Sequence, residues 1–141
     1  MKPTGTRLRS ALLCCVSLGL AAVAAGAQEF RASIAVRDVT PDPLLPVSGG
    51  LGPTTPAESK RGDLNVRALV LENGENRFAV VSADFLGFPG VLGDRVRRMV
   101  PAIPGDHILI GATHTHSAPD VYGFPDGRGG TSADLGYIDR V

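Results

Sequence analysis

Runs of hydrophobic residues, some alternating with polar residues and some uninterrupted, divide the chain into four predicted strands and two short predicted helices. The four strands are expected at 30–40, 65–72, 77–83 and 106–113. One helix is expected at 91–100, and a closing helix is expected after Thr131 or Ser132, whose hydroxyls can cap a helix start. On the helix at 91–100, the inner face is expected to carry Val91, Leu92, Val96, Met99 and Val100.

The order and character of these segments predict an α/β fold with a mixed sheet. Asn73-Gly74 lies between the second and third strands and is a strong signal for a hairpin. The segment 78–81 is apolar on both parities, which is typical of a strand buried on both faces. Strand, helix and strand across 77–113 predict a right-handed βαβ crossover with parallel strands, as part of a larger α/β hydrolase domain.

The N-terminal segment 1–27 has the pattern of a secretory signal peptide. Its basic start carries Lys2, Arg7 and Arg9. The apolar run at 11–25, about 15 residues, is shorter than the roughly 20 that span a bilayer, and small residues at 25–27 suit cleavage near Ala27. We therefore expect a secreted or periplasmic protein whose mature domain covers 28–141. An uncleaved membrane anchor is the alternative.

Charge and cysteine content narrow the classes of partner and fold. Cys14 and Cys15 both lie in the predicted signal, so 28–141 has no disulfide framework. The chain has 14 basic and 14 acidic residues; three basic and no acidic residues lie in 1–27, which leaves 11 against 14 and a formal charge of −3. Without a basic stripe, the mature chain is not expected to bind nucleic acid.

The segment Thr113-His114-Thr115-His116-Ser117 is the main candidate for chemistry. In an extended strand, residues i and i+2 share a face and lie about 6.6 Å apart, so His114 and His116 could converge on one metal ion. The alternative is a pair of solvated or hydrogen-bonded side chains. Two ligands do not complete a zinc site, and His107 lies roughly 23 Å back along the strand, so other ligands must come from elsewhere.

Asp84 follows the third strand just as His114 follows the fourth. Carboxyl ends of neighbouring strands are where open α/β sheets place their ligands. Asp84 is therefore a candidate to accept the spare ring proton of a metal-bound histidine. The alternative is a helix cap or a turn residue.

Two other segments affect how the domain is delimited. The region 41–61 is rich in proline and glycine and predicts a long loop of about 20 residues, either functional or disordered. Leu135, Ile138 and Val141 have helical spacing, and no C-terminal helix signal follows them. We therefore expect 28–141 to be the N-terminal piece of a longer protein.

Five segments, in order, carry a resemblance to a known family. They are Asp38-Val39-Thr40-Pro41, the glycine-rich loop that follows it, the strand at 66–72, Val80-Val81-Ser82-Ala83-Asp84, and Gly111-Ala112-Thr113-His114-Thr115-His116-Ser117-Ala118-Pro119. With them, the chain resembles the N-terminal part of the catalytic domain of neutral/alkaline non-lysosomal ceramidases over roughly 30–141. The last segment is the most specific of the five.

The resemblance implies a secreted zinc-dependent hydrolase that cleaves the amide bond of an N-acyl sphingoid base. It implies that His114 is a zinc (Zn2+) ligand and that His116 lies near the substrate and the bound water. This arrangement differs from the chelate in which both histidines bind one metal ion. We favour the arrangement that the resemblance implies, because a tight loop after the strand would turn His116 away from the metal. It further implies that a histidine, a glutamate and a tyrosine from later segments complete the site.

The resemblance also implies partners. They are a ceramide-like lipid amide, the remainder of the domain beyond Val141, and a membrane surface contacted peripherally. An apolar cleft for the lipid could be walled by Leu44, Leu45, Val47 and Leu51, although a solvated surface loop is the alternative for that region. The family usually continues Ser-Gly-Pro-Gly where this chain has Ser117-Ala118-Pro119-Asp120, so ceramide is less firmly indicated than zinc-dependent amide hydrolysis. A non-catalytic secreted domain of the same fold, or an inactive truncated fragment, remains the competing interpretation.

Overall fold

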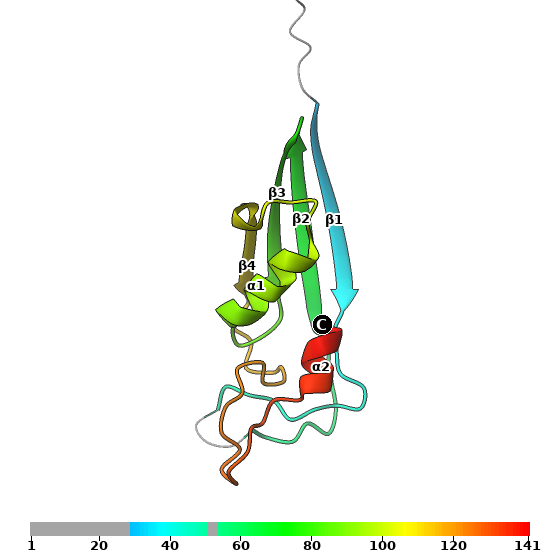
Figure 1. The fold of residues 1–141 in the computed structure, drawn as a ribbon. Helices are drawn as coiled ribbons and strands as arrows, with labels where there is room; N and C mark the ends of the chain where they lie inside the picture. Colours follow the sequence, from blue (N-terminus) through cyan, green and yellow to red (C-terminus); the bar gives the residue numbers. More distant parts are fainter. Residues whose placement is uncertain (1–28, 51–53) are drawn as a thin grey trace, which may run out of the picture.

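A four-stranded sheet and two short helices make up the part of the chain that the computed structural model describes, residues 29–50 and 54–141 (Figure 1). The elements are β1 (Phe30–Asp38), β2 (Asn65–Asn73), β3 (Asn76–Ala83), α1 (Gly90–Met99), the 3-10 turn η1 (Gly105–His107), β4 (Ile108–Ala112) and α2 (Leu135–Arg140). The predicted signal peptide at 1–27 and Leu51 lie outside the described residues.

The sheet is mixed, as the sequence predicts. Its strand order is β1-β2-β3-β4; β1 and β3 are antiparallel to β2, whereas β3 and β4 are parallel. The predicted hairpin is present between β2 and β3, where Asn73 pairs with Asn76 and Gly74 has a φ of 61°. Such a positive φ is readily adopted by glycine. The connection between the parallel strands contains α1 and η1.

Several predicted boundaries differ from the observed ones. The first strand ends at Asp38, because the Asp38 side chain accepts a hydrogen bond from the Thr40 backbone N–H (2.8 Å) and turns the chain. The residues before Ile108, predicted as strand, form η1 instead. The cap of α2 is Asp134 and not Thr131 or Ser132, since the Asp134 carboxylate accepts from the Tyr137 backbone N–H at 2.7 Å.

The predicted inner face of α1 is wrong in part. Val91 and Met99 are exposed, and the buried residue is Gly93. Arg97, which is not on the predicted inner face, reaches back to the sheet and donates two hydrogen bonds to the Ile108 carbonyl (both 3.2 Å). A Cβ atom at Gly93 would lie 3.1 Å from Nη1 of Arg97, so the glycine leaves room for the guanidinium of that side chain.

One face of the sheet is covered by α1 and its connection. The core on this face contains Ala79, Ile103 and Ile108, with Val70, Val100 and Ile110 packed against them. A second core lies beyond the ends of β1 and β3 and contains Val39, Ala83, Phe85, Ala118, Val121 and Tyr137. The Tyr137 hydroxyl donates to the Val39 carbonyl there (2.8 Å), and the ring packs edge-on to Phe85. This second core anchors the loops at that end of the sheet.

The opposite face of the sheet is apolar and uncovered in the described residues. The strand pairing aligns Ile34, Leu69, Val80 and Leu109 in one row across all four strands. Ile34 is 74% exposed, Leu109 57% and Phe78, on the same face, 38%. The prediction that the strand at 77–83 is buried on both faces is therefore wrong for this chain, because the periodicity of a strand does not say what covers its second face.

Within residues 29–50 and 54–141, no helix is long and apolar enough to span a membrane.

Candidate functional site

His114 and His116 follow β4, at the end of the sheet where the long loops lie (Figure 1). The Thr113 N–H donates to the Ala83 carbonyl (3.0 Å), which continues the pairing of β3 and β4 by one residue. His114 then has a φ of 64° and leaves the extended conformation. The spacing argument for residues i and i+2 of a strand therefore does not apply here, and a left-handed residue other than glycine at this position invites a functional explanation.

The rings of His114 and His116 are nevertheless neighbours. Their centroids lie 5.1 Å apart with an angle of 83° between the planes, and both residues are exposed. The Thr115 hydroxyl accepts from the Ser117 N–H (3.2 Å) and tightens the turn that brings the second ring back toward the first.

The orientation of the His114 ring is set by a backbone carbonyl. Its Nδ1 atom lies 2.7 Å from the Leu86 carbonyl oxygen. A carbonyl oxygen only accepts, so this contact requires the proton on Nδ1 and leaves the Nε2 lone pair available. That is the tautomer in which histidine binds a metal through Nε2, with its other nitrogen held by an outer partner. A main-chain partner such as Leu86 has no sequence signature.

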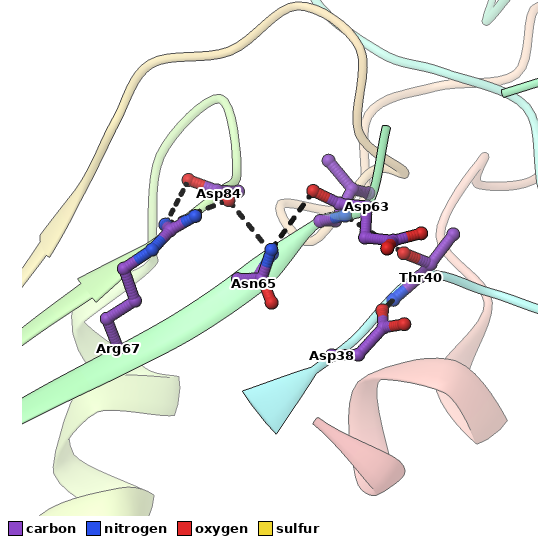
Figure 2. Close-up of polar contacts among 7 residues, drawn as sticks. Asp38, Thr40, Asp63, Asn65, Arg67 and Asp84 are labelled. Carbon is purple, nitrogen blue, oxygen red and sulfur yellow. Dashed lines mark hydrogen bonds and ion pairs between the residues drawn. The ribbon is translucent and has the colours of Figure 1, made fainter. Parts of the chain in front are cut away.

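Asp84, the predicted partner of the histidine, serves elsewhere. Its carboxylate forms an ion pair with Arg67 (3.0 Å) and accepts from the Asn65 backbone N–H (2.9 Å), as Figure 2 shows. Partial burial would raise the pKa of Asp84, but the hydrogen bonds from Asn65 and Arg67 and the Arg67 charge outweigh it and lower the pKa. Asp84 thus fastens the start of β2 to the end of β3, and so fixes the loop that carries Leu86.

The third histidine precedes β4, whereas His114 and His116 follow that strand. His107 is the last residue of η1, and its Nδ1 is 2.9 Å from the Arg77 carbonyl near the start of β3. In the part of the chain that the structure describes, no group of three or more His, Cys, Asp or Glu residues is placed to hold a metal ion. Within residues 29–50 and 54–141, His114 and His116 are therefore two neighbouring imidazoles with no third such residue placed beside them to hold a metal ion.

Comparison with known proteins gives structural matches but no sequence match. No family model and no curated protein matches the chain. The structure is similar to that of a ceramidase complexed with C2, with a TM-score of 0.50 and 19% sequence identity over 69% of this chain. It is also similar to the neutral ceramidase from Pseudomonas aeruginosa, with a TM-score of 0.49 and 20% identity over 69% of this chain.

The chain has the fold of part of a ceramidase. It spans 16% of the ceramidase chain that it matches. The family resemblance indicated by the residues is thereby confirmed at the level of the fold.

Within this portion of the ceramidase fold, a cavity of about 480 Å³ opens beside the histidine pair. Its lining includes Gly49, which lies against the His116 ring, and Leu86, whose carbonyl contacts His114, together with Phe124 and Ser132 from the last loop. The lining is mostly apolar with a few hydroxyls, a composition that suits a largely apolar organic ligand.

The loop after the histidines is organised by Asp120, a residue at which the sequence departs from the ceramidase pattern. Asp120 is 1% exposed, and its carboxylate accepts from the backbone N–H groups of Tyr122 (2.7 Å), Gly123 (3.2 Å) and Phe124 (2.7 Å) and from the Ser132 hydroxyl. A buried carboxylate that receives this many donors orders the surrounding loop. The sequence signal is an aspartate followed by glycines and aromatic residues, which also fits an ordinary turn.

The long loop at 41–61 borders a second hollow in the ceramidase fold, of about 530 Å³. Leu44, Leu45 and Val47 line it together with Ser117 and Pro119 from the segment after the histidines. Main-chain bonds from Val47 and Ser48 tie this loop to the segment at 118–119. Three of the four predicted wall residues thus border one hollow, which is distinct from the cavity beside His116.

Proposed function

We propose that this chain is the N-terminal part of a secreted zinc-dependent amidase that hydrolyses the N-acyl bond of ceramide or a related amide lipid. The observation that carries the proposal is the contact between His114 Nδ1 and the Leu86 carbonyl, which leaves Nε2 free at the loop end of a ceramidase fold. The predicted signal at 1–27 supports the assignment to a secreted or periplasmic protein.

His114 would hold the metal through Nε2. The chemistry that zinc supplies when bound is polarisation of the scissile carbonyl and activation of water near neutral pH. His116, whose ring is next to that of His114, would donate a proton to the leaving amine or to the developing oxyanion. Further ligands would come from segments outside 29–141, since the described residues hold no complete set.

Binding of one metal by both histidines is the alternative within this proposal. Ring centroids 5.1 Å apart in an edge-on arrangement are compatible with it. Under our proposal, His114→Ala loses both metal and activity, whereas His116→Ala loses activity and keeps most of the metal. Loss of metal in both variants would establish the chelate instead.

The uncovered apolar face of the sheet supports a further part of the proposal. We infer that the remainder of the ceramidase domain packs against the row Ile34, Leu69, Val80 and Leu109, since this chain spans 16% of the matching ceramidase. An apolar face of this kind is otherwise unfavourable in water. Peripheral contact of this face with a membrane surface is the competing use.

An inactive fragment or non-catalytic domain is the second candidate, and the lack of a three-residue metal cluster among the described residues favours it for the isolated chain. The deciding experiment is an assay on a fluorescent N-acyl sphingosine with the longest natural form of the secreted protein. We expect hydrolysis that a chelator abolishes and zinc restores. Hydrolysis that resists the chelator would refute the zinc site, and zinc binding without hydrolysis would refute the lipid amide substrate.

A further inference from the structure

Gly49 lies directly against the ring of His116. A Cβ atom built at Gly49 would be 2.9 Å from both Cγ and Nδ1 of His116 and 3.1 Å from Cδ1 of Leu86. Carbon atoms do not approach ring atoms this closely without displacement. Gly49 also has a φ of 101°, which L-residues rarely adopt. Two independent constraints therefore favour glycine at this position.

The backbone around Gly49 is held in place against the histidine segment. The Ser48 N–H donates to the Ala118 carbonyl (2.9 Å), and Ser48 and Ala118 are both buried. Val47 forms bridges to Thr55 and to Pro119. Because these bonds join the residues just before Gly49 to the residues just after His116, the Gly49 backbone is held against the His116 ring and has little room to move away from a side chain.

Packing contacts orient the His116 ring. Among the described residues, its nitrogens make no side-chain hydrogen bond within the chain, in contrast to His114 on the Leu86 carbonyl. The ring has Gly49 against its Cγ–Nδ1 side and His114 edge-on at 5.1 Å between centroids. The side that faces Gly49 is the Nδ1 side, so Nε2 is the nitrogen left for other contacts.

We propose that Gly49 is a positioning residue that holds the His116 ring next to His114 with Nε2 directed away from the Gly49 backbone. Its catalytic consequence rests on the function proposed above, whereas the contact itself is testable without turnover. A side chain at position 49 would push the ring away from the place where it can exchange a proton with the substrate.

The test uses the full chain, labelled with ¹³C and ¹⁵N in histidine and free of metal, so that three imidazoles report separately by NMR. Gly49→Ala is compared with Gly50→Ala, a matched control, because a Cβ at Gly50 meets nothing within 4 Å. We expect Gly49→Ala to shift the His116 ring signals and leave those of His107 in place, and Gly50→Ala to shift neither. An unchanged His116 spectrum in a folded Gly49→Ala variant would overturn the proposal.

A double-mutant cycle covers the case in which Gly49→Ala folds poorly. The drop in Tm caused by Gly49→Ala is expected to be smaller in a His116→Ala background, where the ring is absent, than in the parent chain. Equal drops in both backgrounds would assign the whole effect to the φ of residue 49 and to the contact with Leu86, and would overturn the role of the His116 ring.

An activity measurement separates this inference from the proposed function. In the longest natural form of the protein, Gly49→Ala should lower kcat about 100-fold with unchanged zinc content, since small misplacements of a catalytic group have effects of that size. Retention of the parent kcat would overturn the positioning role. If the parent itself hydrolyses no amide lipid, the proposed function fails and the NMR comparison still decides the contact.

Discussion

The Nδ1 atom of His114 lies 2.7 Å from the carbonyl oxygen of Leu86, and the backbone of His114 is left-handed, with a φ of 64°. The hydrogen bond joins the loop after β3 to the loop after β4. Left-handed backbone costs an ordinary residue about 1–2 kcal/mol. The fold thus maintains an unfavourable backbone conformation at a residue whose ring is oriented by a hydrogen bond to the main chain.

This strain leads to a prediction about two substitutions at the same position. His114→Gly and His114→Ala both remove the imidazole and its bond to Leu86, but only glycine relieves the left-handed backbone. We expect His114→Gly to be more stable than His114→Ala by about 1 kcal/mol in urea denaturation. A more stable alanine variant would show that residue 114 is not left-handed in solution.

The buried carboxylate of Asp120 is expected to stabilise the loop at 120–132. Asp120→Asn weakens its bonds from the N–H groups of Tyr122 and Phe124 and should lower the free energy of unfolding by about 2 kcal/mol. Asp126→Asn is the matched control, because Asp126 accepts from two backbone N–H groups at the exposed surface. Equal losses in the two variants would contradict the importance of burial.

Acid should lower the stability that Asp84 provides through its bonds to Asn65 and Arg67 of β2. The pKa of Asp84 in the folded chain is lowered, so its contribution is present above the unfolded value of about 3.9 and is lost as pH falls through the folded value. We expect Asp84→Asn to cost about 0.5–1 kcal/mol at pH 7, since Arg67 is partly exposed, and to reduce the loss of stability below about pH 4. Asp106→Asn, at an exposed position, controls for the charge; the same reduction there would contradict the assignment.

Alkali should weaken the core at Tyr137. Burial raises the pKa of the Tyr137 hydroxyl above its usual value. Its contribution is therefore complete below the unfolded pKa of about 10 and is lost as pH rises above it toward the folded value. Tyr137→Phe should cost about 1 kcal/mol at pH 7, because the bond to the Val39 carbonyl is lost, and should reduce the alkaline loss. Tyr122→Phe, half exposed, is the comparison, and an identical profile for both would argue against a buried hydroxyl at 137.

The uncovered sheet face should make the isolated chain associate or bind an apolar dye. Ile34→Lys places a charge on that face at the middle of the edge strand β1, whereas Ser33→Lys places it on the opposite side of β1. We expect Ile34→Lys to reduce self-association and dye binding more than Ser33→Lys, with stability changed by less than about 0.5 kcal/mol. Light scattering and dye fluorescence measure both. No difference between the two variants would show that this face is not the apolar surface responsible.

The sequence alone determined the element types, the Asn73-Gly74 hairpin, the mixed sheet and the position of the histidine pair after the last strand. These features depend on side-chain periodicity and turn chemistry, which are local. Its resemblance to ceramidases agrees with the fold. The roles of His114 in zinc binding and of His116 in proton transfer remain predictions.

The tertiary structure decided which atoms meet. The hydrogen-bond partner of His114 is the backbone carbonyl of Leu86, which any residue could supply. The His116 ring packs against Gly49, which comes from a loop far away in the sequence. Asp84 pairs with Arg67 because the antiparallel register of β2 and β3 brings the start of one strand beside the end of the other. Such contacts depend on how strands pair and how loops pack across the fold, and the periodicity of residues along the sequence predicts neither of these.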